Sequence, residues 1–268
     1  MACGESDRRG PAALVGRSPV RDTVRMSSRS DAVPAPAPTP AWYSLLWGAV
    51  GVAFIVAVAG FWAAGEVLES VTDRDGIAMW DRPLLDWMIA ARTPAADAAI
   101  AWYSNAGGPL WQPIVTAAVV AFLCWRYRSV RPFVLTLIAA GGALAMTVLG
   151  KRAVGRIRPP FEQAIPPHEV SASFPSGHSL NALVIAGILC YLVLIHLDGR
   201  RPLARVAWVA FFTVYALTMG LSRVYLGHHW LTDVLAAWVL GLAWLAMVIG
   251  VHRLWHAMRP QPDRGPVE

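Results

Sequence analysis

Six long apolar segments constrain most strongly what this chain can fold into. At a rise of about 1.5 Å per residue, helices of their length approach or exceed the roughly 30 Å hydrocarbon thickness of a bilayer. Charged residues make up only 15% of the 268-residue chain, whereas a soluble domain carries about 25%. We therefore predict an all-α, polytopic membrane protein with six transmembrane helices, at residues 42–64, 110–125, 132–150, 180–197, 206–221 and 234–251.

The distribution of basic residues predicts the orientation of these spans. Fifteen of the 23 Lys and Arg residues lie in the two terminal segments and in the loops around 126–131 and 200–205. Six spans place these four segments on the same side of the membrane, and the positive-inside rule assigns that side to the cytoplasm. We expect a multi-pass protein of the plasma membrane with both termini in the cytoplasm.

The two ends of the chain differ in composition from the apolar body. Residues 1–41 contain six arginines and an alternating Pro-Ala stretch that cannot build a core, so we expect a disordered cytoplasmic tail. Residues 42–252 form the expected six-span membrane domain, and 253–268 a cytoplasmic C-terminal tail. A translation start at Met26 instead of Met1 is an open alternative, and so is a role for the tail beyond contact with anionic lipid head groups.

The loop between the first two spans contains a candidate surface helix. Trp80, Leu84, Trp87 and Ala91 recur at helical spacing, and Asp81 precedes Pro83 as a helix start. Such a stripe is typical of an amphipathic helix lying in the outer membrane interface. An ordinary packed helix outside the membrane fits the same pattern, and the sequence leaves both interpretations open.

Three polar blocks interrupt the apolar pattern. They read GKRAVGRIRPP at 150–160, FPSGHS at 174–179 and SRVYLGHHWLTD at 222–233. The first follows the third span, the second begins the fourth, and the last connects the fifth to the sixth. The predicted topology therefore brings all three to the outer face of the membrane, where we expect the active site.

The basic residues of these blocks predict an anion site. Lys151, Arg158 and Arg223 lie beside an apolar membrane body, where unpaired charge is costly. Residues 175–178 lie at the start of the fourth span, where free backbone N–H groups and the helix dipole favour a phosphate-like group. Gly177 permits close approach of the backbone. A phosphoryl group is therefore the expected ligand.

Two histidines and one carboxylate supply the remaining chemistry. His229 and Asp233 are four residues apart and share one face of a helix that begins there. A carboxylate that accepts from one imidazole nitrogen sets the tautomer and leaves the other nitrogen as nucleophile or base. His178, from a different segment, can then protonate the leaving oxygen. These are the parts that phosphoryl transfer requires.

In their order and spacing, the three blocks resemble the tripartite signature of the type 2 phosphatidic acid phosphatase superfamily. The resemblance implies that His229 is the nucleophile and forms a phosphohistidine, that Asp233 is its partner, and that His178 is the acid. It also implies catalysis without a metal or other cofactor, and the seven His and three Cys contain no group at zinc spacing. The phosphoryl oxygens would be bound by Lys151, Arg158, Ser176, Gly177 and Arg223.

For three further residues near the site, the sequence predicts only a general role. Arg152 and Arg156 are expected to contact lipid head groups rather than to complete the phosphate clamp. His228 lacks the carboxylate four residues later that His229 has, so we expect a supporting or structural role for it.

The resulting hypothesis is an integral membrane lipid phosphatase that hydrolyses a phosphomonoester or diphosphate head group. A polyprenyl, undecaprenyl-type diphosphate is the favoured substrate because the site is expected to face outward. Alternatives are a phosphatidic acid or phosphatidylglycerophosphate phosphatase, a lipid phosphotransferase, and a non-catalytic lipid-phosphate binder or transporter. Vanadium haloperoxidases resemble the same blocks but are soluble. The expected partners are the lipid substrate and the bilayer, without nucleic acid, and the oligomeric state is open.

Overall fold

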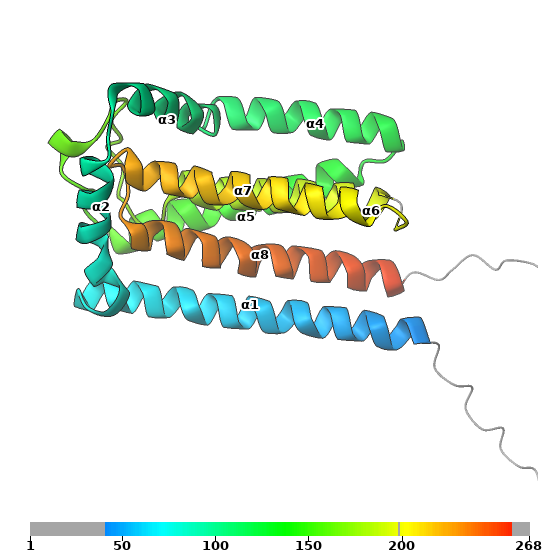
Figure 1. Ribbon diagram of the computed structural model, residues 1–268. Helices are drawn as coiled ribbons and strands as arrows, with labels where there is room; N and C mark the ends of the chain where they lie inside the picture. The colour runs from blue at the N-terminus through cyan, green and yellow to red at the C-terminus, as the bar shows by residue number, and fades with distance from the viewer. Residues whose placement is uncertain (1–40, 198, 259–268) are drawn as a thin grey trace, which may run out of the picture. The chain divides into compact units, whose positions relative to one another are not determined.

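The computed structural model describes residues 41–197 and 199–258, and the regular secondary structure of this part is entirely helical (Figure 1). The predicted all-α class is therefore confirmed there. The expected N-terminal tail up to residue 40, the alternative start at Met26 and the segment from 259 lie outside the described residues. The helices are α1 (Ala41–Asp73), η1 (Gly76–Trp80), α2 (Asp81–Ala90), α3 (Pro94–Ala106), α4 (Trp111–Tyr127), α5 (Arg131–Val154), η2 (Phe161–Gln163), α6 (Gly177–His196), α7 (Pro202–Tyr225) and α8 (Leu231–Met258).

Five of the described helices are long and apolar enough to cross a membrane, namely α1, α5, α6, α7 and α8. The predicted span at 110–125 corresponds to α4, which has 17 residues and is joined to α3 at an angle of 50°. Gly107, Gly108 and Pro109 form this break, because glycine weakens a helix and proline cannot donate its hydrogen bond. The part of the chain that the structure describes thus has five candidate spans, or six if the bent pair crosses as one.

Helix α6 lies at the centre of the bundle, in contact with α5, α7 and α8. Leu180, Val184 and Ile188 recur every four residues along it and are fully buried. Gly241 of α8 allows the close approach of these two helices, because a Cβ there would lie 2.7 Å from Cδ2 of Leu183. Large apolar side chains on α1 and on the outward faces of α4, α5 and α7 are instead exposed, as contact with lipid tails requires.

The predicted surface helix is present as α2, which lies across one end of the helical bundle (Figure 1). Its buried side chains are Asp81 and Leu85, whereas Trp80 and Trp87 are exposed. Of the stripe identified in the sequence, Trp80, Trp87 and Ala91 are exposed and Leu84 is partly buried, and contact of the stripe with a membrane stays a prediction. A second helix of the same loop, α3, was not anticipated.

The ends of the described chain lie together, since α1 begins and α8 finishes at the end of the bundle opposite α2 (Figure 1). Helix α8 continues six residues beyond the expected boundary at 252, to Met258. The loops after α5 and between α7 and α8 meet at the end where α2 lies, and this end carries the polar site.

Candidate active site

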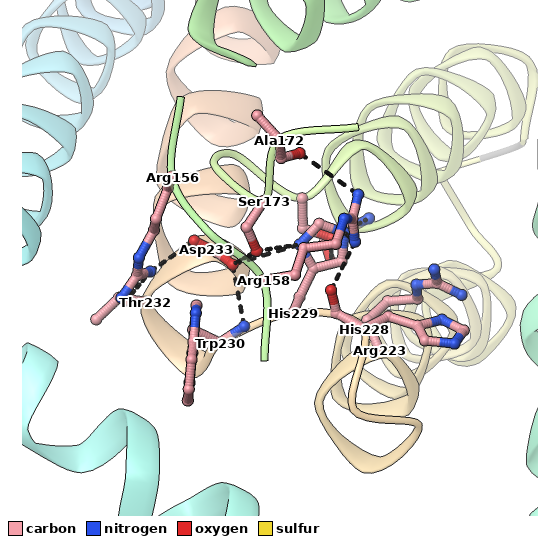
Figure 2. A network of polar contacts seen from close by, with 12 residues as sticks. Arg156, Arg158, Ala172, Ser173, Arg223, His228, His229, Trp230, Thr232 and Asp233 are labelled. Carbon is pink, nitrogen blue, oxygen red and sulfur yellow. Dashed lines mark hydrogen bonds and ion pairs between the residues drawn. The ribbon is translucent and has the colours of Figure 1, made fainter. Parts of the chain in front are cut away.

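The three polar blocks come together as the topology predicted. Ser176 N of the second block donates to Asp233 O of the third at 3.1 Å. Figure 2 shows side chains of the first and third blocks converging near Ser173, which lies just before the second block. Helix α5 ends at Gly155, which has a φ of +60°, a left-handed conformation that glycine adopts without strain. The chain then crosses toward α8 and returns to α6. Ser173 N donates to Arg156 O at 2.8 Å, and Ile165 N donates to Leu226 O at 2.9 Å.

His229 and Asp233 face each other inside the protein, where both are fully buried. His229 Nδ1 lies 3.4 Å from Asp233 Oδ2, and this oxygen also accepts from Trp230 N at 3.0 Å and from the Ser173 hydroxyl (Figure 2). On the other side of the ring, Nη1 of Arg158 lies 3.2 Å from Nε2 of His229. The Asp233 carboxylate thus faces Nδ1 of His229, whereas Nε2 lies beside the guanidinium group of Arg158.

The pKa of His229 is lowered from 6.5 to about 4, mainly by burial; Asp233 opposes this shift, and the charges of Arg158 and Arg223 contribute to it. The imidazole is therefore neutral near pH 7. With Nδ1–H directed at Asp233, Nε2 is unprotonated and its lone pair faces Nη1 of Arg158.

A carboxylate that the sequence analysis missed, Glu169, lies among the predicted phosphate-binding cations. Its Oε2 accepts from Nη2 of Arg158 at 2.7 Å, and its Oε1 accepts from Nη2 of Arg223. Nδ1 of His178 lies 3.6 Å from the same Oε1. The structure therefore brings three predicted site residues together around one anion, which belongs to the chain itself.

The charge environment of Glu169 follows from these contacts. Burial alone would raise the pKa of its carboxyl group, but Arg223 and Arg158 outweigh burial and lower the pKa to about 2. The group is ionised at any physiological pH. The sequence offered only a weak signal, since Glu169 is one of two glutamates in the segment 161–173 that connects two motif blocks.

Lys151 and Arg158 both hold the segment at 171–172. Lys151 Nζ donates to Ser171 Oγ at 3.1 Å and to Ala172 O, while Arg158 Nε donates to Ser171 O at 2.6 Å. Arg223 is 2% exposed and donates from Nη1 to Oγ of Ser104 at 2.7 Å. Ser104 lies in α3, outside the three blocks, and was also missed.

The start of α6 has the predicted helix-terminal geometry. Ser176 is the N-cap, and its Oγ accepts from Ser179 N at 3.4 Å and pairs with Ser179 Oγ at 2.8 Å. A Cβ on Gly177 would lie 3.0 Å from Cγ2 of Thr147. The Ser176 hydroxyl is engaged with its own helix, and the phosphate-binding roles of Ser176 and Gly177 stay predictions.

The expectation that Arg156 contacts lipid head groups is wrong. Its Nη1 lies 2.6 Å from Oδ1 of Asp233, and its Nη2 lies 2.6 Å from Oδ2 of Asp81. Arg152 is exposed, so its head-group contact stays a prediction. His228 Nε2 bonds Ile165 O at 2.7 Å, which fits the supporting role expected for it.

A pocket opens beside the site and is lined by Arg158, Glu169, His228, Phe161 and His168, among others. The rings of Phe161 and His168 stack with centroids 3.8 Å apart. Within residues 41–197 and 199–258, no three His, Cys, Asp or Glu side chains are grouped so that they could hold a metal ion.

Residues 129–257, which contain all three motif blocks, match the PAP2 superfamily. Phosphatidylglycerophosphatase B of Bacillus subtilis (strain 168) is 36% identical over 124 residues, which make up 46% of this chain and 60% of that protein. Undecaprenyl-diphosphatase BcrC of the same strain is 31% identical over 99 residues, or 36% of this chain and 42% of that protein. Both matches span less than two thirds of the relative.

A solved structure extends the likeness over most of the fold. The crystal structure of a transmembrane PAP2 type phosphatidylglycerolphosphate phosphatase from Bacillus subtilis superposes with a TM-score of 0.68 at 25% identity. The superposition covers 76% of this chain and 98% of that one. The resemblance to the type 2 phosphatidic acid phosphatase superfamily is confirmed by these matches.

Proposed function

From the PAP2 superfamily domain that this chain carries at residues 129–257, we propose that the protein is an integral membrane lipid phosphatase that acts through a phosphohistidine intermediate. One observation carries the proposal. The unprotonated Nε2 of a buried, neutral His229 lies 3.2 Å from Nη1 of Arg158, while the other ring nitrogen faces Asp233. A nucleophile beside a cation is the arrangement that attack on a phosphoryl group needs.

The first chemical step follows from this geometry. Nε2 of His229 attacks phosphorus, the P–N bond forms, and the bond between phosphorus and the leaving oxygen breaks. His178 gives a proton to that oxygen, so the leaving group departs as a neutral alcohol or a protonated phosphate. Asp233 stabilises the positive charge that develops on the His229 ring.

The second step releases the phosphate. A water molecule attacks the phosphohistidine, and His178, now unprotonated, takes the proton from the water. The P–N bond breaks, and inorganic phosphate leaves with His229 neutral again. The protons balance over the cycle because His178 receives in this step the proton that it lost in the first.

Glu169 suggests where the phosphoryl oxygens bind. Its carboxylate already accepts from Arg158 and Arg223, and phosphoryl oxygens prefer the same donors. The substrate would replace Glu169 on these two guanidinium groups, with Lys151 close by. Ser176 and Gly177 would add the start of α6 to the clamp, and neither a metal nor another cofactor is required by this scheme.

The substrate class is a lipid with a phosphorylated head group. Exposed apolar helices beside a polar site suit a molecule whose tail stays in the bilayer, and the pocket beside Arg158 has room for part of the head group. Our favoured substrate is a polyprenyl diphosphate at the outer face of the plasma membrane. Phosphatidylglycerophosphate is the second candidate, which the name of the 36% identical Bacillus relative supports.

Phosphate release by the detergent-purified protein tests the proposal. The panel contains a polyprenyl diphosphate, phosphatidylglycerophosphate, phosphatidic acid and a water-soluble ester, each with EDTA. Wild-type protein and His229→Ala are compared, with His196→Ala at the far end of α6 as the matched control. We expect release that survives EDTA, persists in the control and disappears in His229→Ala.

The other outcomes separate the alternatives. Transfer of phosphate to an added alcohol or lipid, instead of release, indicates a phosphotransferase. Head-group binding without turnover in the wild type indicates a lipid-phosphate binder or transporter. Unchanged turnover in His229→Ala contradicts the mechanism itself.

A further inference from the structure

A buried ion-pair network joins the surface helix α2 to the catalytic carboxylate, and the mechanism above does not use it. Asp81, the first residue of α2, is 5% exposed. Its Oδ2 lies 2.6 Å from Nη2 of Arg156, whose Nη1 lies 2.6 Å from Oδ1 of Asp233. One guanidinium therefore bridges two buried carboxylates that lie 152 positions apart in the sequence.

The two oxygens of Asp233 have separate partners. Oδ2 faces Nδ1 of His229 and accepts from Trp230 N and from the Ser173 hydroxyl. Oδ1 is held by Arg156 (Figure 2). Arg156 thus contributes, from the Oδ1 side, to how the carboxylate is rotated, and a rotated carboxylate would no longer present Oδ2 to His229.

Asp81 anchors the other end of this bridge. Besides pairing with Arg156, its Oδ1 accepts from Thr232 N at 2.8 Å and its Oδ2 accepts from the Thr232 hydroxyl at 2.7 Å. Thr232 lies in the first turn of α8, where backbone N–H groups lack helical partners. The same hydroxyl accepts from Arg156 Nη1 at 2.7 Å. Asp81 therefore fixes Arg156 and the start of α8 together.

The aromatic ring of Trp230 also contacts the guanidinium group of Arg156. The guanidinium carbon of Arg156 lies 5.7 Å from its centroid, and Nε1 of Trp230 donates to Ile157 O at 2.9 Å. A planar guanidinium group that is paired with a carboxylate through each of its two terminal nitrogens, and that lies beside an aromatic ring, has little freedom to move.

We propose that Arg156 and Asp81 are positioning residues for the His229 nucleophile, with Arg156 orienting Asp233 and Asp81 orienting Arg156. The inference rests on the proposed function because it takes His229 as the reacting group. Asp81 lies outside the 129–257 stretch that matches the PAP2 superfamily. In this proposal, helix α2 supplies part of the alignment of the nucleophile from outside that stretch.

Kinetics of four single variants test the proposal: Asp81→Asn, Arg156→Lys, Arg156→Gln and the matched control Asp86→Asn. Asp86 belongs to the same helix but forms an exposed pair with Arg82. We expect kcat to fall about tenfold or more in Asp81→Asn and further in Arg156→Gln, with KM within about twofold. Arg156→Lys should lie between wild type and Arg156→Gln, because a lysine cannot fork between two carboxylates.

A double variant tests the order of action. If Asp81 acts through Arg156, Asp81→Asn should cost nothing more in an Arg156→Gln background. Thermal unfolding of each variant shows the fraction folded at the assay temperature. Losses that match those of Asp86→Asn, or that match the loss of folded protein, would overturn the inference.

A readout that needs no substrate keeps this inference separate from the proposed function. The protein is labelled with 15N-histidine, and the signals of His229 are assigned by comparison with the spectrum of His229→Gln. In the wild type, the His229 ring should carry its proton on Nδ1. Arg156→Gln should mix the two tautomers, whereas Asp86→Asn should not. An unchanged ring in Arg156→Gln contradicts the positioning role. Absence of lipid turnover by the wild type would count against the proposed function. The tautomer of His229 in Arg156→Gln would still decide whether Arg156 is a positioning residue.

Discussion

Oε2 of Glu169 accepts a hydrogen bond from Nη2 of Arg158 at 2.7 Å. The same guanidinium contacts the predicted nucleophile through its other nitrogen. In the proposed mechanism, we therefore expect a phosphoryl oxygen to take the place of this carboxylate on Arg158 during attack by His229.

Replacement of Glu169 by Gln should strengthen phosphate binding. The amide keeps the shape of the side chain but removes the negative charge that competes for Arg158 and Arg223. We expect the inhibition constant for inorganic phosphate to fall roughly threefold to tenfold, since a charge-assisted contact is exchanged for a neutral one. Inhibition assays measure this change.

Glu162→Gln is the control for that experiment, because Glu162 is exposed in the same loop. It should leave the inhibition constant unchanged. An equal effect of both substitutions would mean that only the net charge of the loop matters, and weaker inhibition in Glu169→Gln would contradict the competition.

The lowered pKa of His229 predicts how stability depends on pH. Between pH 6.5 and about 4, the unfolded chain protonates this side chain while the folded protein leaves it neutral. The free energy of unfolding should therefore decrease as the pH falls through this window, with a slope that corresponds to the uptake of about one proton on unfolding. Thermal unfolding in detergent from pH 7 to pH 4 measures it, and His229→Gln should show a weaker dependence. Equal slopes for the two proteins would refute the shift.

Two adjacent glycines of α5 should respond differently to alanine. A Cβ on Gly142 would lie 2.2 Å from the Trp244 ring, which is held by a 2.9 Å hydrogen bond from Nε1 to Ala139 O. We expect Gly142→Ala to destabilise the protein by about 1–3 kcal/mol through overpacking.

Gly141 is the matched position, because nothing lies within 4 Å of an added Cβ there. Gly141→Ala should be neutral or stabilising by up to about 1 kcal/mol, since alanine favours a helix. Unfolding of both variants in detergent compares them, and equal stability would mean that Trp244 moves aside.

The orientation can be tested at Val170, which is fully exposed in the loop between the first two motif blocks. In a background without the native cysteines, Val170→Cys should react in intact cells with a maleimide that cannot cross the membrane, because we expect the site to face outward. A cysteine at Arg200, in a loop expected to be cytoplasmic, is the control and should react only after lysis. The reverse pattern would place the site in the cytoplasm.

Much of the fold was predictable because a helix that crosses a bilayer needs a long, continuous run of apolar residues, which can be read from the sequence. Apolar runs long enough for a bilayer mark α1, α5, α6, α7 and α8 without any knowledge of their packing. The weakest prediction was the second span, where Gly107, Gly108 and Pro109 divide the helix. Hydropathy detects apolar length but carries little information on the angle between two helical pieces.

The sequence by itself also identified the candidate reacting groups. The spacing between His229 and Asp233 has a direct helical meaning, and the blocks around Lys151 and His178 follow from the order of the spans. The tertiary structure alone decided the second set of partners. Asp81 meets Thr232 across 151 positions and Arg223 meets Ser104 across 119. Such contacts depend on how loops and helices pack at the end of the bundle, so no periodicity or short spacing records them. For this reason Glu169, Ser104 and the true partners of Arg156 became visible only in three dimensions.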